Sequence, residues 1–202
     1  MADLHMPRAL EIAIFPLRTV LFPGASLPLK IFEQRYLDMT KECIRDDTPF
    51  GVCLLRDGTE VGPPALPHPV GCTARILEWD MPHLGLFHLA CRGERVFRIV
   101  EHWTLKNGLL RAQVELREPL AQMVLPSDYQ SLAELMGRII NKFGEKHFPG
   151  TVRLDDADWV ACRLAEALPL EAEFKQQLLE VDNPIERLDL LNEFLQTRSV
   201  ML

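Results

Sequence analysis

The sequence predicts an α+β protein in which a β-rich body with one intervening helix is followed by a small helical bundle. In the first 120 residues, short apolar stretches are punctuated by Pro and Gly, as is typical of strands. After Pro126 the apolar residues recur with the helical period. The charge changes at the same point: residues 1–126 carry 14 Lys and Arg against 15 Asp and Glu, whereas residues 127–202 carry 8 against 14. We therefore expect a body over residues 1–125 and an acidic four-helix bundle, packed on that body, over residues 126–202.

The composition is that of an ordinary globular protein, with 48% hydrophobic and 25% charged residues in a chain of 202. The apolar runs are much shorter than the roughly 18 to 20 residues that a membrane-spanning helix requires. Met1 to Pro7 show no basic segment leading into an apolar stretch, so a secretory signal is not expected. These features predict a cytoplasmic protein without a membrane partner.

Five cysteines are spread through the chain, and none forms a C-x-x-C pair. Cysteines at such distances are expected to remain reduced in the cytoplasm, and they give no zinc-binding spacing. We therefore expect neither a metal nor another cofactor.

Seven segments of the body are predicted to be strands, and few helices interrupt them. Such a pattern favours a mostly antiparallel sheet that is curled into a barrel or a sandwich. The interior is expected to be filled by Leu17, Phe22, Leu29 and Phe32. The predicted strands are Leu10–Phe15, Leu27–Phe32, Phe50–Leu55, Val70–Trp79, Leu84–Cys91, Arg95–Trp103 and Leu109–Arg117.

The last of these strands has the clearest pattern, because Ala112, Val114 and Leu116 alternate with polar residues. Asn107 and Gly108 precede it, and Asn-Gly readily adopts the positive φ values of a tight hairpin. A hairpin between the last two strands is therefore expected.

The body also contains one predicted helix and one predicted loop. Gln34–Ile44 can place its apolar residues on one stripe of a helix. Arg56–Pro69 contains four prolines, including Pro63 and Pro64, and proline cannot donate the backbone hydrogen bonds of a ladder. This long connection is a candidate binding surface.

Four amphipathic helices are predicted in the tail. The first begins with a capping box between Ser127 and Gln130, and the second is capped by Asp155. The third covers Glu171–Val181. The fourth begins with Asn183 as its cap and Pro184 at its first position.

Several blocks of the sequence resemble, in the same order, the N-terminal substrate-recognition domain of the Lon ATP-dependent protease. The first block runs from Ile14 (IFPLRTVLFPG) through LPLKIFEQRY to Tyr36. The others are Val70–Ile76, Gly93–Ile99 (GERVFRI) and the tail segment Leu168–Leu195. The resemblance implies a pseudo-barrel of the kind found in PUA domains, followed by a helical bundle, and a role in recognising polypeptides. It implies a free-standing module without the ATPase and peptidase modules of the protease.

No catalytic motif is recognisable in the sequence. The phosphate-loop pattern G-x-x-x-x-G-K-[ST] is missing, and none of the four serines has a G-x-S-x-G context. Acidic residues at 155, 156 and 158 fit the start of a helix better than a calcium loop. We therefore expect a protein that is not an enzyme.

The candidate partner-binding residues are few. Arg92, Arg95 and Arg98 could form a basic patch, although Arg95 fits a structural role better, paired with backbone carbonyls or with Glu33 or Glu94. The remaining candidates are Pro63, Pro64 and Phe32.

The leading hypothesis is a non-catalytic module that binds unfolded or exposed apolar segments of other proteins, either at a sheet edge or in a groove between barrel and bundle. The alternative is the binding of RNA or a small ligand through the PUA-like barrel. The net charge of −7 makes nucleic acid an unfavoured partner. The oligomeric state is left open by the sequence.

Overall fold

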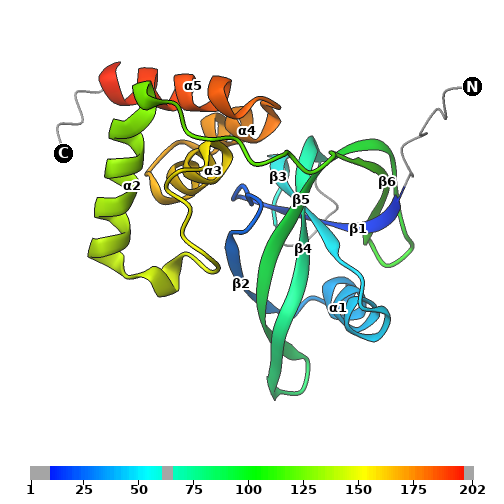
Figure 1. Cartoon of the computed structure of the whole chain (residues 1–202). Helices are drawn as coiled ribbons and strands as arrows, with labels where there is room; N and C mark the ends of the chain where they lie inside the picture. Colours follow the sequence, from blue (N-terminus) through cyan, green and yellow to red (C-terminus); the bar gives the residue numbers. More distant parts are fainter. Residues whose placement is uncertain (1–9, 61–65, 198–202) are drawn as a thin grey trace, which may run out of the picture.

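The computed structural model describes residues 10–60 and 66–197, and in these ranges six strands precede four α-helices, with a further helix between the second and third strands (Figure 1). The strands are β1 (Leu10–Leu17), β2 (Ser26–Ile31), β3 (Phe50–Asp57), β4 (Leu66–His83), β5 (Leu86–Thr104) and β6 (Leu110–Leu116). The α-helices are α1 (Gln34–Asp46), α2 (Gln130–Phe143), α3 (Ala157–Ala167), α4 (Ala172–Glu180) and α5 (Pro184–Thr197), and η1 (Ser127–Tyr129) and η2 (Glu145–His147) are short 3-10 helices.

The six strands form one sheet in the order β2-β5-β4-β3-β1-β6, and a further pairing between β5 and β6 closes it into a pseudo-barrel. All neighbours are antiparallel except β1 and β3, which run parallel. The helices of the tail gather on one side of the barrel, and α1 lies apart from them beside the barrel strands (Figure 1). The predicted fold class is therefore confirmed.

The predicted hairpin between the last two strands is present. Thr104 of β5 pairs with Leu110 of β6, and Gly108 in the turn has a φ of +82°. Ala112 and Val114 are fully buried, whereas Gln113 and Glu115 are exposed. The alternation of apolar and polar residues along this strand thus correctly indicated which of its faces lies inside the barrel.

Two predictions about the body are wrong. The expected strands Leu84–Cys91 and Arg95–Trp103 are parts of the single strand β5, which pairs first with β2 and then with β6. The predicted loop Arg56–Pro69 is shorter than expected, because β3 continues to Asp57 and β4 begins at Leu66. Pro67 is accommodated beside shifts of register between β3 and β4, where the regular ladder is interrupted.

The helix starts of the tail are partly as predicted. Asn183 accepts a hydrogen bond from the backbone N–H of Ile185 at 2.9 Å, as expected for its capping role. The cap of α3 is Asp156 rather than Asp155, and it accepts from the backbone N–H of Trp159. The capping box at Ser127 does not form, since this residue starts a 3-10 turn and its hydroxyl contacts Asp128.

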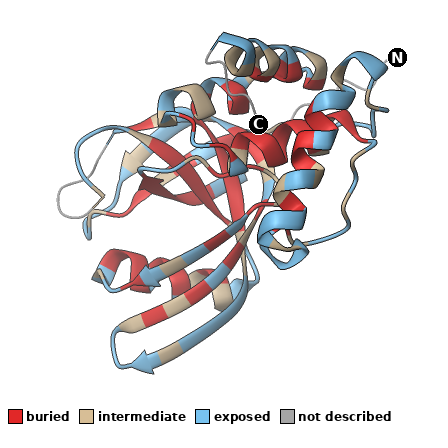
Figure 2. Cartoon of the chain, turned by 90° about the vertical axis from the view of Figure 1, so that its left-hand side faces the viewer, coloured by how far each residue is buried: buried red, intermediate tan, exposed pale blue. Residues whose placement is uncertain are grey.

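The buried side chains form two clusters, and the larger one extends from the barrel into the helices. It contains Phe22, Phe50 and Cys72 from the barrel together with Leu164 and Leu188 from the helices. Figure 2 shows buried segments on both sides of the junction as well as within the barrel. Apolar burial, the dominant favourable term in folding, therefore joins the two parts of the chain.

Within the described ranges, no helix is both long and apolar enough to cross a membrane.

Polar side chains also cross the junction, and they bind backbone carbonyl groups. Arg163 of α3 donates from Nη2 to the carbonyl oxygen of Pro23 at 2.6 Å. Gln176 of α4 donates from Nε2 to the carbonyl oxygen of Val70 at 3.0 Å. Both side chains are buried, so these bonds are shielded from competing water.

The C-terminal end of α4 is held by two arginines. A helix leaves its last carbonyl groups without partners within the helix. Arg117, just after β6, donates to the carbonyl oxygens of Leu179, Glu180 and Val181 at 3.0 to 3.3 Å. Arg187 of α5 donates to those of Leu178 and Val181 at 2.7 and 2.6 Å. Positive charge at this end of a helix is also favoured by the helix dipole.

Replacing the buried Arg187 is expected to destabilise the protein strongly. The change Arg187→Met removes the donors to Leu178 and Val181 and leaves Asp158, which pairs with Arg187 at 2.5 Å, without its cation. The expected loss in the free energy of unfolding is about 3 kcal/mol, measured by urea denaturation. Arg138→Met on the exposed face of α2 is the matched control, and equal losses for the two variants would contradict this role.

Gly93 of β5 is required by the close approach of another backbone. A Cβ atom at this position would lie 2.2 Å from the carbonyl oxygen of Phe22, whereas one at Gly137 in α2 would meet its nearest atom, Cδ1 of Leu154, at 3.7 Å. We expect Gly93→Ala to lower the free energy of unfolding by about 2 kcal/mol through the forced backbone shift. Gly137→Ala is expected to raise it by about 0.5 kcal/mol because alanine favours the helix. Urea denaturation of both variants tests this, and a Gly93→Ala protein as stable as the parent would refute it.

Candidate functional site

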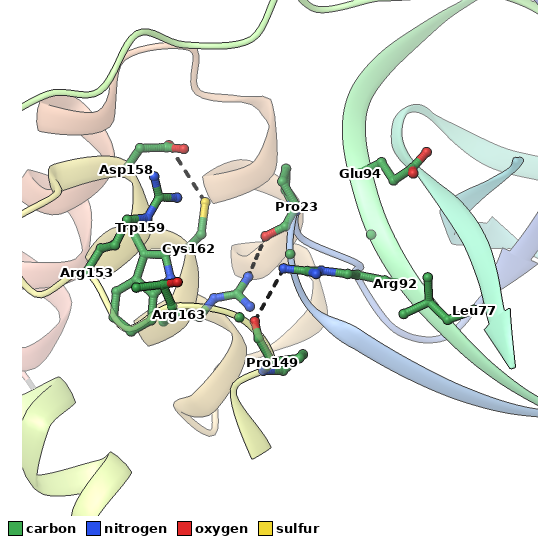
Figure 3. Close-up of a pocket in the computed structure, with 14 residues that line it drawn as sticks. Pro23, Leu77, Arg92, Glu94, Pro149, Arg153, Asp158, Trp159, Cys162 and Arg163 are labelled. Atoms are coloured by element: carbon green, nitrogen blue, oxygen red, sulfur yellow. Dashed lines mark hydrogen bonds between the residues drawn. The ribbon is translucent and has the colours of Figure 1, made fainter. Parts of the chain in front are cut away.

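A hollow of about 640 Å³ lies where the barrel meets the helices (Figure 3). We call it the seam hollow. Its volume is within the range of pockets that bind small ligands or side chains. Its wall combines the turn before β2, strands β4 and β5, the segment after η2, and α3. The lining residues are Pro23, Gly24, Leu77, Arg92, Gly93, Glu94, Pro149, Gly150, Thr151, Arg153, Asp158, Trp159, Cys162 and Arg163.

The turn before β2 forms one side of the seam hollow, and glycines let it approach its neighbours closely. Gly24 has a φ of +78°, and a Cβ atom there would lie 3.6 Å from Nη1 of Arg163. The N–H of Gly24 donates to the carbonyl of Gly93 at 2.7 Å, and the N–H of Gly93 donates to that of Ala25 at 2.9 Å. The Phe-Pro-Gly turn is therefore fixed to β5 on one side and to α3 on the other.

The two carboxylates of the seam hollow are already paired. Glu94 accepts from Nε of Arg75 at 2.6 Å. Asp158 accepts from Nη1 of Arg187 at 2.5 Å. Neither Arg75 nor Arg187 lines the hollow, so each carboxylate is neutralised from outside it.

Three arginines line the same hollow in different environments. Arg163 is buried and binds the Pro23 carbonyl and, at 3.0 Å, Glu166. Arg153 is about half exposed and pairs with Asp156 at 3.3 Å. Arg92 contacts the carbonyl of Pro149 from Nη2 at 3.4 Å, which is long for a hydrogen bond. Figure 3 labels all three arginines, and they reach the hollow from α3 (Arg163), from the segment before α3 (Arg153) and from β5 (Arg92).

Apolar surface is also available in the seam hollow. Leu77 of β4 is 57% exposed, and Trp159 in the first turn of α3 is half-buried. An accessible aliphatic side chain and an indole ring on facing walls can both contact an apolar ligand. The hollow therefore offers packing contacts together with cationic donors.

The one thiol in the wall is not a nucleophile at neutral pH. Burial raises the pKa of Cys162 to about 12, so almost none of it is in the thiolate form that reacts. Burial likewise raises the pKa of Cys43 to about 11. Among the described residues, no three His, Cys, Asp or Glu side chains are grouped closely enough to hold a metal ion.

The three arginines predicted as a basic patch all lie on β5, but each lines a different hollow. Arg92 lines the seam hollow, Arg95 an adjacent hollow of about 200 Å³, and Arg98 a third of about 230 Å³. Arg95 donates from Nε and Nη2 to the carbonyl of Arg117 at 3.3 and 2.7 Å. Backbone pairing of this kind was one expectation for Arg95. The carboxylate that pairs with Arg95 is Glu118, at 3.9 Å, and not the suggested Glu33 or Glu94, which pair with Arg35 and Arg75.

The other candidates lie outside the seam hollow or cannot be placed. Phe32 follows directly after β2 and is 60% exposed, so the expectation that it fills the barrel is wrong. Leu17 and Phe22 are buried as expected. Pro63 and Pro64 lie outside the described residues.

The wall that α3 contributes to the seam hollow was not recognised from the sequence. The contribution of α3, through Asp158, Trp159, Cys162 and Arg163, depends on how the helix packs against the barrel. One local signal was available, because Arg163 directly precedes Leu164 on the apolar stripe of that helix. An arginine so close to a buried stripe indicates a guanidinium with specific acceptors.

Comparison with known proteins identifies relatives across almost the whole chain. A crystal structure of a Lon N-terminal domain protein from Xanthomonas campestris is 35% identical, with a TM-score of 0.78, and the match covers 91% of this chain and 98% of that one. The N-terminal domain of a Mycobacterium avium complex Lon protease has the same fold, at 20% identity and a TM-score of 0.64, over 95% of this chain and 100% of that one.

Full-length relatives match in one part only. The Lon protease of Anaeromyxobacter dehalogenans is 26% identical over 200 residues, which are 95% of this chain and 24% of the relative. The Lon protease of Paraburkholderia phytofirmans is 28% identical over 192 residues, which are 88% of this chain and 23% of that protein. The chain therefore spans about a quarter of the length of these relatives. The family model described as the ATP-dependent protease La (LON) substrate-binding domain matches residues 11–197, and the chain belongs to this family.

Proposed function

We propose that this chain is a non-catalytic module that binds exposed apolar segments of other polypeptides, and that these segments bind in the seam hollow. The observation that carries the proposal is an open hollow with accessible apolar and cationic groups at the junction of barrel and helices, in a member of the LON substrate-binding domain family. Substrate recognition by the family supports a protein ligand. The paired carboxylates and the protonated Cys162 support binding rather than chemistry.

Of the two binding modes expected from the sequence, the structure favours the groove over the sheet edge. The outer strand of the sheet is β2, which carries the exposed residues Pro28 and Lys30. Proline has no N–H to donate to an added strand, and an exposed lysine also disfavours strand pairing at an edge. A peptide strand is therefore poorly accommodated on β2, whereas the seam hollow is open.

Barrel and bundle form one recognition unit in this proposal. The seam hollow has walls from both sides of Pro126, and the larger core cluster includes residues from both.

The cytoplasm is the proposed location, because the five cysteines are free and buried, as is usual in a reducing compartment. Binding of RNA or a small ligand through the barrel, the alternative from the sequence, stays a prediction.

Shortening the apolar wall is expected to weaken peptide binding. Leu77 lines the seam hollow, and Leu84 at the tip of the same hairpin is 99% exposed and does not line it. The change Leu77→Ser should weaken the affinity for an unfolded model polypeptide about tenfold, because it removes a contact worth about 1.4 kcal/mol. Fluorescence anisotropy with labelled, reduced and carboxymethylated lactalbumin measures this affinity.

The matched control for this experiment is Leu84→Ser, which makes the same chemical change outside the seam hollow. It should leave the affinity unchanged. A parent protein that shows no binding of the unfolded polypeptide above background would refute the proposed function. Equal effects of the two variants would instead show that binding occurs away from the seam hollow.

A further inference from the structure

We propose that the seam hollow selects polypeptide segments in which an acidic side chain lies next to an apolar one, with Arg92 as the group that binds the carboxylate. This inference rests on the proposed function and adds a chemical class of ligand to it. It depends on which charged side chains line the hollow and on whether each already has an oppositely charged partner.

Arg92 is the one guanidinium of the seam hollow whose charge is not balanced within the described part of the chain. Its single hydrogen bond, from Nη2 to the Pro149 carbonyl, is 3.4 Å long, and it has no carboxylate partner within 4 Å there. By contrast, Arg163 pairs with Glu166 at 3.0 Å, and Arg153 pairs with Asp156 at 3.3 Å. A half-buried guanidinium with one weak acceptor retains donors for a ligand.

The acidic residues near Arg92 are held by other cations. Arg92 lies in register with Arg75 on the neighbouring strand β4. Arg75 binds Glu94 at 2.6 Å and Asp47 at 2.9 Å, so both carboxylates already have a cationic partner. Asp158 is bound by Arg187. A carboxylate brought by a ligand would therefore meet Arg92 without displacing an existing ion pair.

The turn after η2 lies close to the guanidinium of Arg92. A Cβ atom at Gly150 would lie 2.8 Å from Nη2 of Arg92, and Gly150 has a φ of +100°. The guanidinium thus lies directly over a residue without a side chain, and Figure 3 shows it extending from β5 toward this turn. From this position its planar guanidinium can bind a carboxylate through two parallel hydrogen bonds.

Apolar and cationic contacts occur in the same hollow, which defines the class of segment. Leu77 and Trp159 line the hollow together with Arg92. One ligand side chain can contact the apolar wall while its neighbour reaches the guanidinium. The chain has a formal net charge of −7, so its long-range field does not attract acidic ligands. The preference for acidic segments therefore comes from the local contact with Arg92. We expect it to appear in the affinity rather than in the association rate.

The experiment compares two peptides that differ in one side chain. Both are labelled, acetylated and amidated decapeptides of alternating Leu and Ser, with a single central Glu in one and Gln in the other. Fluorescence anisotropy should show the parent protein binding the Glu peptide about tenfold more tightly, as expected for a charge-assisted pair of hydrogen bonds. Arg92→Gln should reduce this ratio to about one while retaining the affinity for the Gln peptide, and Arg92→Lys should give an intermediate ratio because it keeps the charge but not the fork.

Controls separate the possible outcomes. Arg138→Gln on α2 makes the same change of net charge outside the hollow and should preserve the ratio. A ratio of one in the parent protein, or equal losses for both peptides in Arg92→Gln with an unchanged melting temperature, would overturn the inference and leave the proposed function standing. A parent protein that binds neither peptide would overturn both. A third peptide with Gln at the centre and a free C-terminal carboxylate tests the other occupant, and if only this peptide depends on Arg92, the site binds chain ends instead.

Discussion

Hydrogen bonds from arginine side chains to backbone carbonyls hold the helices of this protein to one another and to its barrel. Arg163 and Arg187 are almost fully buried, and an isolated charge in such a position would be very costly. Each of them binds at least one carbonyl oxygen and one carboxylate, so the cost of removing the guanidinium from water is offset. Arg117 completes the arrangement at the end of α4. The position of α3, and therefore one wall of the seam hollow, depends on these contacts.

Those parts of the fold that follow from local periodicity were predictable from the sequence. The alternation around Val114 gave the last strand and its inner face, and the pattern Asn183-Pro184 gave the start of α5. The errors have a common physical origin in tertiary context. Asp155 and Asp156 are equally good caps by composition, and only the packing of α3 makes Asp156 the buried one. Phe32 has a core composition but lies just beyond the end of β2, where the chain turns toward α1 and exposes it.

The candidate site was less predictable than the fold, because its two walls are more than fifty residues apart in the chain. Arg92 was recognised, but Trp159 was not, since no local pattern shows that the first turn of α3 faces the end of the Phe-Pro-Gly turn. The grouping of Arg92, Arg95 and Arg98 was suggested by their spacing along one strand. The different acceptors of Arg92 and Arg95 could be known only from the positions of Pro149 and of Arg117.

Three hydrogen bonds across the junction have main-chain acceptors, and this has a consequence for how the family can vary. The carbonyl oxygen of Pro23, Val70 or Leu179 is present whatever side chain the residue carries. Substitutions at these acceptor positions therefore do not break the contact, and no compensating change is needed in the donor. These three donor–acceptor pairs would consequently show little covariation among homologues, although their members are in direct contact. For these pairs the constraint would be visible only on the donor side, as invariance of Arg163, Gln176 and Arg117.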